Sequence, residues 1–130
     1  MLPMTVELDV EEGRARATEI CSVFPEVEVL SYNGQHTGFK VRGKAFAYYQ
    51  VDHHGDGRIT LAVRLTREDQ TALVSSDPAR VSISPYVGRY GWVDIDLQAR
   101  PVDWDEITGF ARDSYRIVAP KSLANLVANE

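Results

Sequence analysis

The sequence predicts a single α+β domain with a mostly antiparallel sheet and with helices near both ends of the chain. Helix-capping signals at Asp9 and Asp103 are each followed by apolar residues at helical spacing. Between them, short segments alternate apolar and polar residues and are separated by turn residues, which is typical of antiparallel strands. A length of 130 residues suits one domain, expected over residues 1–130 with a core of about 8–128.

The first helix is expected to begin at Asp9, because Asp9 and Glu12 have the spacing of a capping box. Pro25 then ends the segment. Cys21 belongs to the apolar face, so we expect a buried structural thiol rather than a reactive one. The residues that share this face are Val10, Ala17, Ile20, Cys21 and Phe24.

Short strands are expected after this helix. Asn33-Gly34 is a strong hairpin dipeptide, and Gly43 interrupts the pattern a second time. If the strand stays regular across Gly43, then Lys40, Arg42 and Lys44 lie on the same side of it. The strand-like segments are 27–29, 39–41 and 44–51.

Residues 58–65, RITLAVRL, have the most regular alternation in the chain. They predict a half-buried strand whose outer face carries Arg58 and Arg64. The inward residues are Ile59, Leu61, Val63 and Leu65, and the outward residues are Arg58, Thr60, Ala62 and Arg64.

A short helix capped by Thr66 is expected next, with Ala72, Leu73 and Val74 as its apolar side. Strands at 81–83 and 91–97 should follow, and the second should carry Trp92, Asp94 and Asp96 on one face. Asp103 and Glu106 form a second capping box, which starts a helix that runs to about residue 118. Residues 121–128 are expected to form one more short helix after Pro120.

The stretch DHHGD, residues 52–56, resembles a metal site at first sight. Adjacent residues of an extended strand point to opposite faces, so His53 and His54 would not converge on one ion. Gly55-Asp56-Gly57 is a turn sequence between two strand-like segments. We therefore expect a hairpin turn and no metal.

The net charge of −5 is unevenly distributed. Residues 1–33 hold seven acids and two bases, which gives −5, whereas residues 36–67 hold six bases and two acids, which gives +4. One interpretation is a solvated surface that varies along the chain. The other is a polar molecule whose basic face meets an anion.

Bulk features predict a cytoplasmic protein. The single cysteine cannot form an internal disulfide, no apolar run reaches the roughly 20 residues of a membrane span, and the acidic N-terminal segment does not resemble a signal peptide. Phosphate-loop and nucleophile-elbow motifs are both missing from the sequence. Asp94 and Asp96 are expected on a solvated strand face, so we expect neither an enzyme nor a cofactor.

Several segments together resemble the MmcQ/YjbR-like proteins. GFKVRGKAFA at 38–47 is similar to a strand pair of that family, and GWVDIDL at 91–97 to a later strand. EITGFARDSYRIV at 106–118 is similar to its terminal helix, with the Ser114-Tyr115 pair, and Tyr115 is expected to be structural. The strand RITLAVRL followed by a short helix also fits, so the resemblance covers about residues 10–128.

This resemblance implies a compact α+β fold called a double wing and a DNA-binding function. Phosphate contacts would come from basic residues of the hairpins and of the 88–91 loop. The expected nucleic-acid-binding residues are Lys40, Arg42, Lys44, Arg58, Arg64 and Arg89. The alternative is an adaptor domain for a protein or small ligand, and a homodimer is also consistent with the sequence.

The residues Tyr86, Tyr90 and Trp92 gather around the 88–91 loop. Aromatic rings beside an arginine can stack on bases. They can also cap the edge of a core with their polar tips in water, and this is the interpretation that we favour.

Overall fold

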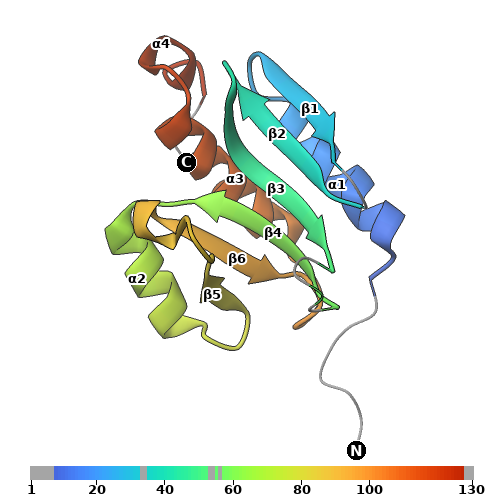
Figure 1. Ribbon diagram of the computed structural model, residues 1–130. Coiled ribbons are helices and arrows are strands. Elements are labelled where there is room, and N and C mark those ends of the chain that lie inside the picture. Colours follow the sequence, from blue (N-terminus) through green and yellow to red (C-terminus); the bar gives the residue numbers. More distant parts are fainter. Residues whose placement is uncertain (1–7, 33–34, 53–54, 56, 128–130) are drawn as a thin grey trace, which may run out of the picture.

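The computed structural model describes residues 8–32, 35–52, 55 and 57–127, and it has a six-stranded antiparallel sheet at its centre (Figure 1). The strand order is β1-β2-β3-β4-β6-β5, so strands that follow one another in the chain are paired, except that β4 pairs with β6 and β5 lies at the edge. The strands are β1 (Val27–Ser31), β2 (Thr37–Val41), β3 (Lys44–Val51), β4 (Ile59–Arg64), β5 (Val81–Ile83) and β6 (Trp92–Asp96).

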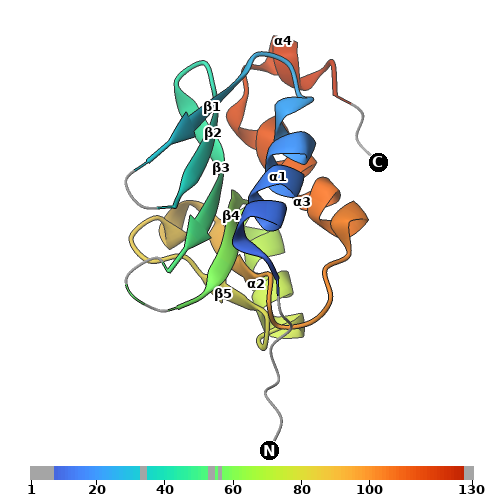
Figure 2. The ribbon, with the colours of Figure 1, turned by 90° about the vertical axis from the view of Figure 1, so that its right-hand side faces the viewer.

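Helices α1 (Val10–Ser22) and α3 (Trp104–Val118) cover one face of this sheet, as the side view in Figure 2 shows. Helix α2 (Arg67–Ser76) packs beside β5 and β6, and α4 (Lys121–Ala124) packs against α3. A short 3-10 helix, η2 (Gly88–Tyr90), precedes β6. The expected α+β fold class is confirmed.

The predicted helix starts are confirmed by their capping hydrogen bonds. The carboxylate of Asp9 accepts from Glu12 N at 2.9 Å, and the hydroxyl of Thr66 accepts from Asp69 N at 3.0 Å. The carboxylate of Asp103 accepts from Asp105 N at 3.1 Å and from Glu106 N at 3.3 Å. These bonds satisfy donors that a helix start leaves unpaired.

The core lies between the sheet and the helices α1 and α3. Tyr115 is fully buried there, stacks on Phe24 with ring centroids 5.1 Å apart, and donates a hydrogen bond to Pro25 O at 2.7 Å. Its role is therefore structural, as the family resemblance implied. Cys21 is also fully buried, as expected, and burial raises the pKa of its thiol to about 12.

Ser114 supports an irregularity in the sheet. The register between β2 and β3 shifts beside Phe46, which is a β-bulge. The Ser114 hydroxyl donates to Phe46 O and accepts from Arg64 N at 2.9 Å, so it satisfies two backbone groups that the ladder leaves unpaired. The Ser114-Tyr115 pair of α3 thus anchors the helix to the sheet and to the end of α1.

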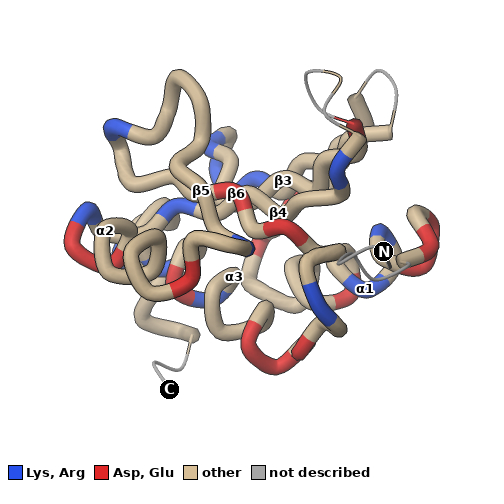
Figure 3. The backbone as a smooth tube through the Cα atoms, turned by 90° about the horizontal axis from the view of Figure 1, so that it is seen from below, with Lys and Arg blue, Asp and Glu red and all other residues tan. Residues whose placement is uncertain are grey.

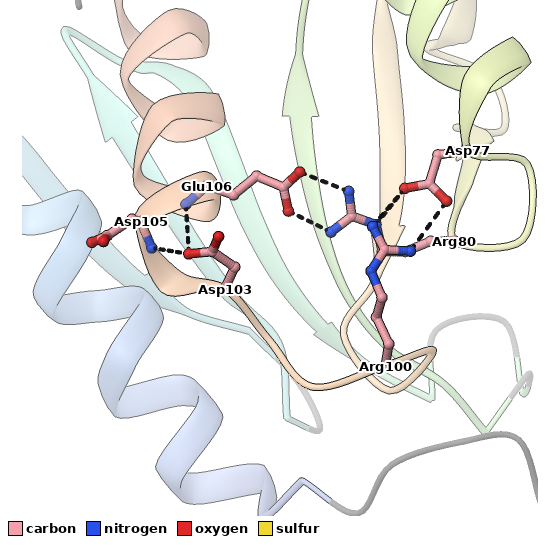
Figure 4. Close-up of polar contacts among 6 residues, drawn as sticks. All are labelled: Asp77, Arg80, Arg100, Asp103, Asp105 and Glu106. Carbon is pink, nitrogen blue, oxygen red and sulfur yellow. Dashed lines mark hydrogen bonds and ion pairs between the residues drawn. The ribbon is translucent and has the colours of Figure 1, made fainter.

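An ion-pair network centred on the buried Arg80 joins α3 to the turn before β5 (Figure 4). Arg80 is only 6% exposed, and its guanidinium donates two hydrogen bonds to Glu106 and one to Asp77. Arg100 reaches the same Asp77 carboxylate at 2.9 Å. The second capping box is thus only half formed, because the Glu106 side chain binds Arg80 instead of returning to the helix cap.

Two sequence expectations about burial are wrong. Strand β4 is buried on both faces rather than half-buried, because Thr60 and Ala62 lie between the side chains of β3 and β6. In α2 the buried residue is Gln70, whose amide donates to Gly88 O and Trp92 O, whereas Ala72 is exposed. Leu73 and Val74 of the expected apolar side do pack against the core, so the polar bonds of Gln70 to a neighbouring loop supplement an apolar contact.

Strands β3 and β4 form the expected hairpin, and Asp52 holds its turn by accepting from Gly55 N and Gly57 N. His53, His54 and Asp56, like Asn33-Gly34, lie outside the described residues. Within the described part of the chain no group of three His, Cys, Asp or Glu residues could hold a metal ion. In the same part, no helix is long and apolar enough to span a bilayer.

Candidate functional site

The sheet face opposite α1 and α3, here called the open face, is the candidate functional site. No helix lies on it in the two ribbon views (Figures 1 and 2). Because side chains alternate along each strand, the register places every second residue on this face. From the pairing, the outward residues of the inner strands include Lys40, Tyr48, Gln50, Thr60, Ala62, Trp92, Asp94 and Asp96.

Three aromatic rings form a row across the open face, here called the aromatic row. Tyr48 is at its centre, with ring centroids 6.2 Å from Tyr32 and 5.9 Å from Trp92. Gly38 makes this arrangement possible, since a Cβ there would lie 2.7 Å from the Tyr32 ring and 3.1 Å from the Tyr48 ring. Ala62 pairs with Tyr48 on the opposite side and is also small. Small neighbours thus leave room for large rings.

Two hollows open on this face, one on each side of the Tyr48 ring. The Tyr32 hollow has a volume of about 300 Å³ and is lined by Tyr32, His36, Tyr48 and Gln50. The Trp92 hollow has a volume of about 380 Å³, and its wall includes the loop before η2. Its principal lining residues are Tyr48, Gln50, Ser84, Tyr86, Trp92 and Asp94.

Polar groups are fixed within these aromatic walls. The Ser84 hydroxyl donates to Asp94 Oδ1 at 2.7 Å, and the Thr60 hydroxyl donates to Gln50 Oε1 at 3.0 Å. In the Tyr32 hollow, His36 Nδ1 accepts from Val51 N at 3.1 Å. Mostly aromatic walls with a few positioned polar groups are typical of binding sites.

The Tyr48 hydroxyl remains protonated across the physiological range. Burial raises the pKa of Tyr48 first, the neighbouring Tyr32 raises it further, and Lys40 lowers it. Lys40 lies on the same face of β2 as Gly38, which pairs with Tyr48. The centre of the aromatic row therefore offers an O–H donor beside a cation.

The segment between β5 and β6 borders the open face and projects from it (Figure 3). Tyr86 in this segment has φ 68°, a conformation that bulky residues rarely adopt, and its side chain is 84% exposed. Tyr90 is also exposed, whereas Trp92 is buried. The core-edge interpretation is therefore wrong for Tyr86 and Tyr90, because the segment turns outward before β6 begins.

Gly91 ends this segment with φ 103°, and a Cβ at this position would collide with Leu65 O. Only glycine fits so close to the neighbouring backbone in that conformation. Leu65 N donates to Gly91 O at 3.0 Å, which fixes the base of the segment to the end of β4. A rigid base thus carries the exposed rings.

Four of the six predicted binding residues border the open face. Lys40 and Arg64 point outward from β2 and β4, and the Arg64 guanidinium donates to Tyr90 O at 2.9 Å. Arg89 lies in η2, with its guanidinium 4.9 Å from the centre of the Tyr90 ring. Arg58 lies 3.5 Å from Asp96, an outward residue of β6.

The other two predicted residues, Arg42 and Lys44, lie at the β2–β3 turn. Arg42 and Gly43 both have positive φ, so they form a two-residue hairpin turn and the strand is not regular across Gly43. The expectation that Lys40, Arg42 and Lys44 share one side of a strand is therefore wrong. Arg42 is instead paired with Glu26 through two hydrogen bonds, of 2.6 and 3.0 Å.

Charges of both signs occur on the open face, and Figure 3 shows basic and acidic positions interspersed along the backbone. The four cations named above face three outward acids, Glu28, Asp94 and Asp96, which gives a local sum of +1. A surface of this kind does not attract phosphate by charge alone. Its most distinctive feature is the aromatic row.

Sequence reasoning did not identify Tyr32 and Tyr48 as site residues. The available signal was their place in the alternation: Tyr48 is outward because Ala47 and Tyr49 pair with core residues of β4. Trp92 and Asp94 were correctly placed on one face of their strand. What the alternation could not give is the strand order, which brings β2, β3, β4 and β6 side by side.

Comparison with protein-family models gives a match to the YjbR model over residues 23–117, which is more than half of the chain. The chain belongs to the YjbR family. The match spans the sheet from the end of α1 to most of α3, and it includes the aromatic row. The family resemblance stated from the sequence is therefore confirmed.

A solved structure with a similar fold is Deinococcus radiodurans protein DR2400, described as a DUF419 domain. The two chains share 17% identity with a TM-score of 0.69, and the alignment covers 99% of this YjbR-family chain and 94% of the other. At this identity the likeness concerns the fold alone. A search of curated proteins gives no match.

Proposed function

We propose that this YjbR-family protein binds nucleic acid through the open face and catalyses no reaction. The observation that carries the proposal is the aromatic row of Tyr32, Tyr48 and Trp92, with Lys40, Arg64 and Arg89 at its borders. Aromatic rings on a sheet stack on bases, and neighbouring cations contact the phosphates between them. A cytoplasmic location, expected from the sequence, is part of this proposal.

Single-stranded nucleic acid fits the open face better than a duplex. Duplex binding depends mainly on phosphate neutralisation and calls for a strongly basic surface. Here the local charge sum is only +1, and the chain as a whole carries −5. Stacking on an accessible ring contributes about 1–3 kcal/mol per base and requires bases that are not paired. Tyr32, which is 40% exposed, and the partly exposed Tyr48 are the accessible rings of the aromatic row.

The test is fluorescence anisotropy of labelled single-stranded and duplex DNA, titrated with the protein at about 50 and 200 mM salt. Three phosphate contacts on a single strand predict a log–log salt slope of about −2, which is roughly a 15-fold loss of affinity between these two salt concentrations. We expect the single strand to bind more tightly than the duplex. If neither binds at the lower salt, where charge contacts are strongest, the proposal is wrong.

Lys40→Ala is the most direct variant, with Lys121→Ala as its matched control. Lys40 lies on the open face beside Tyr48, whereas Lys121 is an exposed lysine of α4, which packs on α3. Lys40→Ala should reduce the salt slope by about 0.7 and weaken binding several-fold. Lys121→Ala should leave both unchanged. Equal effects of the two variants would contradict the location of the site.

The second candidate is the adaptor domain for a protein or small ligand. Its support is the pair of hollows, since cavities of about 300–400 Å³ lie at the lower end of the range for small-molecule sites. A homodimer through an outer strand is part of this alternative. Failure of all nucleic acids to bind, together with saturable binding of a small ligand that quenches Trp92 fluorescence, would favour it over the first proposal.

A further inference from the structure

We propose that the Trp92 hollow holds an unpaired guanine base and recognises it through the carboxylate of Asp94. This inference rests on the proposed function, because it names the base that the open face selects. It starts from an apparent contradiction: a carboxylate lies among aromatic side chains on a face proposed to meet phosphates. A phosphate contact cannot explain that carboxylate, since two negative groups repel.

The position of Asp94 gives it access to the hollow. Asp94 is the only charged residue among the described residues that line it, and its side chain is partly exposed. Ser84 donates to Oδ1, which orients the carboxylate from the side of the loop. An ionised carboxylate has about four lone-pair positions, so this single bond leaves acceptor capacity on both oxygens.

The ring walls suit a flat aromatic ligand. Tyr48 and Trp92 line the hollow with planes inclined at 39°, and the exposed ring of Tyr86 lies at the loop side. Lys40 near Tyr48 and Arg64 beside Trp92 are placed to contact the backbone of the same nucleotide chain. The hollow therefore combines stacking surfaces, one carboxylate and neighbouring cations.

Among the common bases, guanine complements a carboxylate best. Its Watson–Crick edge presents two adjacent donors, N1–H and the exocyclic amino group, which the two carboxylate oxygens can accept together. Adenine and cytosine present one amino donor beside a ring nitrogen acceptor, and that acceptor repels a carboxylate. Thymine and uracil present a single N–H between two carbonyl oxygens. A good bidentate pair discriminates against the wrong base by about tenfold or more.

The experiment measures anisotropy of labelled oligothymidines that carry one central guanine, adenine or cytosine, with the matching oligouridines as an RNA arm. A single guanine avoids multistranded guanine structures. We expect the guanine oligonucleotide to bind about tenfold more tightly than the adenine one. Guanosine 5′-monophosphate, titrated alone by Trp fluorescence, tests whether a free nucleotide suffices. The DNA and RNA arms separate the two kinds of strand.

Asp94→Asn is the decisive variant, because an amide offers only one acceptor at nearly the same shape. It should reduce the guanine preference to less than about twofold and leave the affinity for plain oligothymidine unchanged or higher. Asp96→Asn is the matched control: it removes the same charge from the same face of β6, but Asp96 pairs with Arg58 and does not line the hollow. It should keep the full preference.

The outcomes separate this inference from the proposed function. Oligonucleotides that bind without guanine preference, or with a preference that Asp94→Asn retains, overturn the inference and leave the proposed function standing. Guanosine monophosphate that binds the wild type but not Asp94→Asn, while no oligonucleotide binds, supports the guanine site and overturns the proposed function. Binding of neither ligand overturns both.

Discussion

The two faces of the sheet are built from the same strands but differ in what their side chains do. On the helix-covered face, Leu61 and Ile95 pair across β4 and β6 and are buried by α1 and α3. On the open face, the next pair is Ala62 with Asp94, and it borders a hollow. Apolar burial against helices thus stabilises one face, whereas on the other face aromatic rings and fixed polar groups border two hollows. This difference is the basis of our proposal that the open face binds ligand.

The largest expected effect comes from the covered face. Leu61→Ala removes a side chain that is 1% exposed, so it should lower the free energy of unfolding by about 3–4 kcal/mol. Lys40→Ala, on the open face of β2, should change the free energy of unfolding by less than about 0.5 kcal/mol. Urea denaturation followed by circular dichroism measures both. Similar losses for the two variants would show that the faces do not differ as described.

Arg80→Ala should have the next largest effect, although it lies outside the apolar core. Removing this buried arginine leaves Glu106 and Asp77 without their shared partner and should cost about 3 kcal/mol, somewhat less than for a fully buried pair because Glu106 is partly exposed. Arg100→Ala, which removes only the exposed partner of Asp77, is the control and should cost below about 1 kcal/mol. If Arg80→Ala lowered the free energy of unfolding as little as Arg100→Ala, a structural role of Arg80 would be contradicted.

Acid should also weaken this ion-pair network, with a smaller effect on stability than Arg80→Ala. The hydrogen bond from Arg100, followed by the charges of Arg80 and Arg100, holds the pKa of the Asp77 carboxyl below its ordinary value of 3.8. A lowered folded-state pKa means that the charged carboxylate stabilises the fold above the ordinary value, and that this contribution is lost as the pH falls through the lowered pKa. Unfolding measured between pH 5 and about pH 2 should therefore be less pH-dependent in Asp77→Asn than in the wild type. Identical pH profiles would rule out this contribution.

Tyr86→Asn should change stability little and should act mainly on binding. Asparagine tolerates the positive φ that strains a tyrosine, so the free energy of unfolding should stay within about 1 kcal/mol of the wild type and rise if it changes. Binding to single-stranded DNA should nevertheless weaken several-fold, because the variant removes an exposed ring from the border of the Trp92 hollow. Wild-type affinity in this variant would show that Tyr86 is not part of the binding site.

Local patterns in the sequence predicted most of the fold. Asp9, Thr66 and Asp103 mark helix starts because capping is a short-range effect that needs only neighbouring residues. The Arg42-Gly43 turn was also readable, since a two-residue loop with a glycine between alternating segments is typical of a hairpin. The expectation of a regular strand across Gly43 conflicted with this turn signal.

Other features depend on residues distant in the chain and could not be derived in the same way. Arg80 and Glu106 are 26 positions apart in the chain. The sequence around either residue does not indicate that the two will form an ion pair. Strand β4 was taken as half-buried, because alternation reports the side of a side chain but not what covers it. Thr60 and Ala62, both small, were the one hint that large rings of neighbouring strands lie beside them.

The candidate site was predicted in part for the same reason. Lys40, Arg64 and Arg89 were named from local charge, and they do border the open face. Their importance depends on the aromatic row, which forms only when β2, β3 and β6 come together in the sheet. Cross-strand assembly of this kind is not encoded in any one segment.

The central claim, that the open face is where ligand binds, is tested most directly by the two tryptophans. Trp92 lies in the aromatic row, whereas Trp104 begins α3 on the covered side, with the Arg16 guanidinium 5.2 Å from its ring centre. Their indole N–H signals, assigned with Trp104→Phe, can be followed by ¹H–¹⁵N NMR while single-stranded DNA is added. We predict that the Trp92 signal shifts and saturates while the Trp104 signal stays in place. A shift confined to Trp104, or no shift of Trp92 at saturating DNA, would contradict the claim.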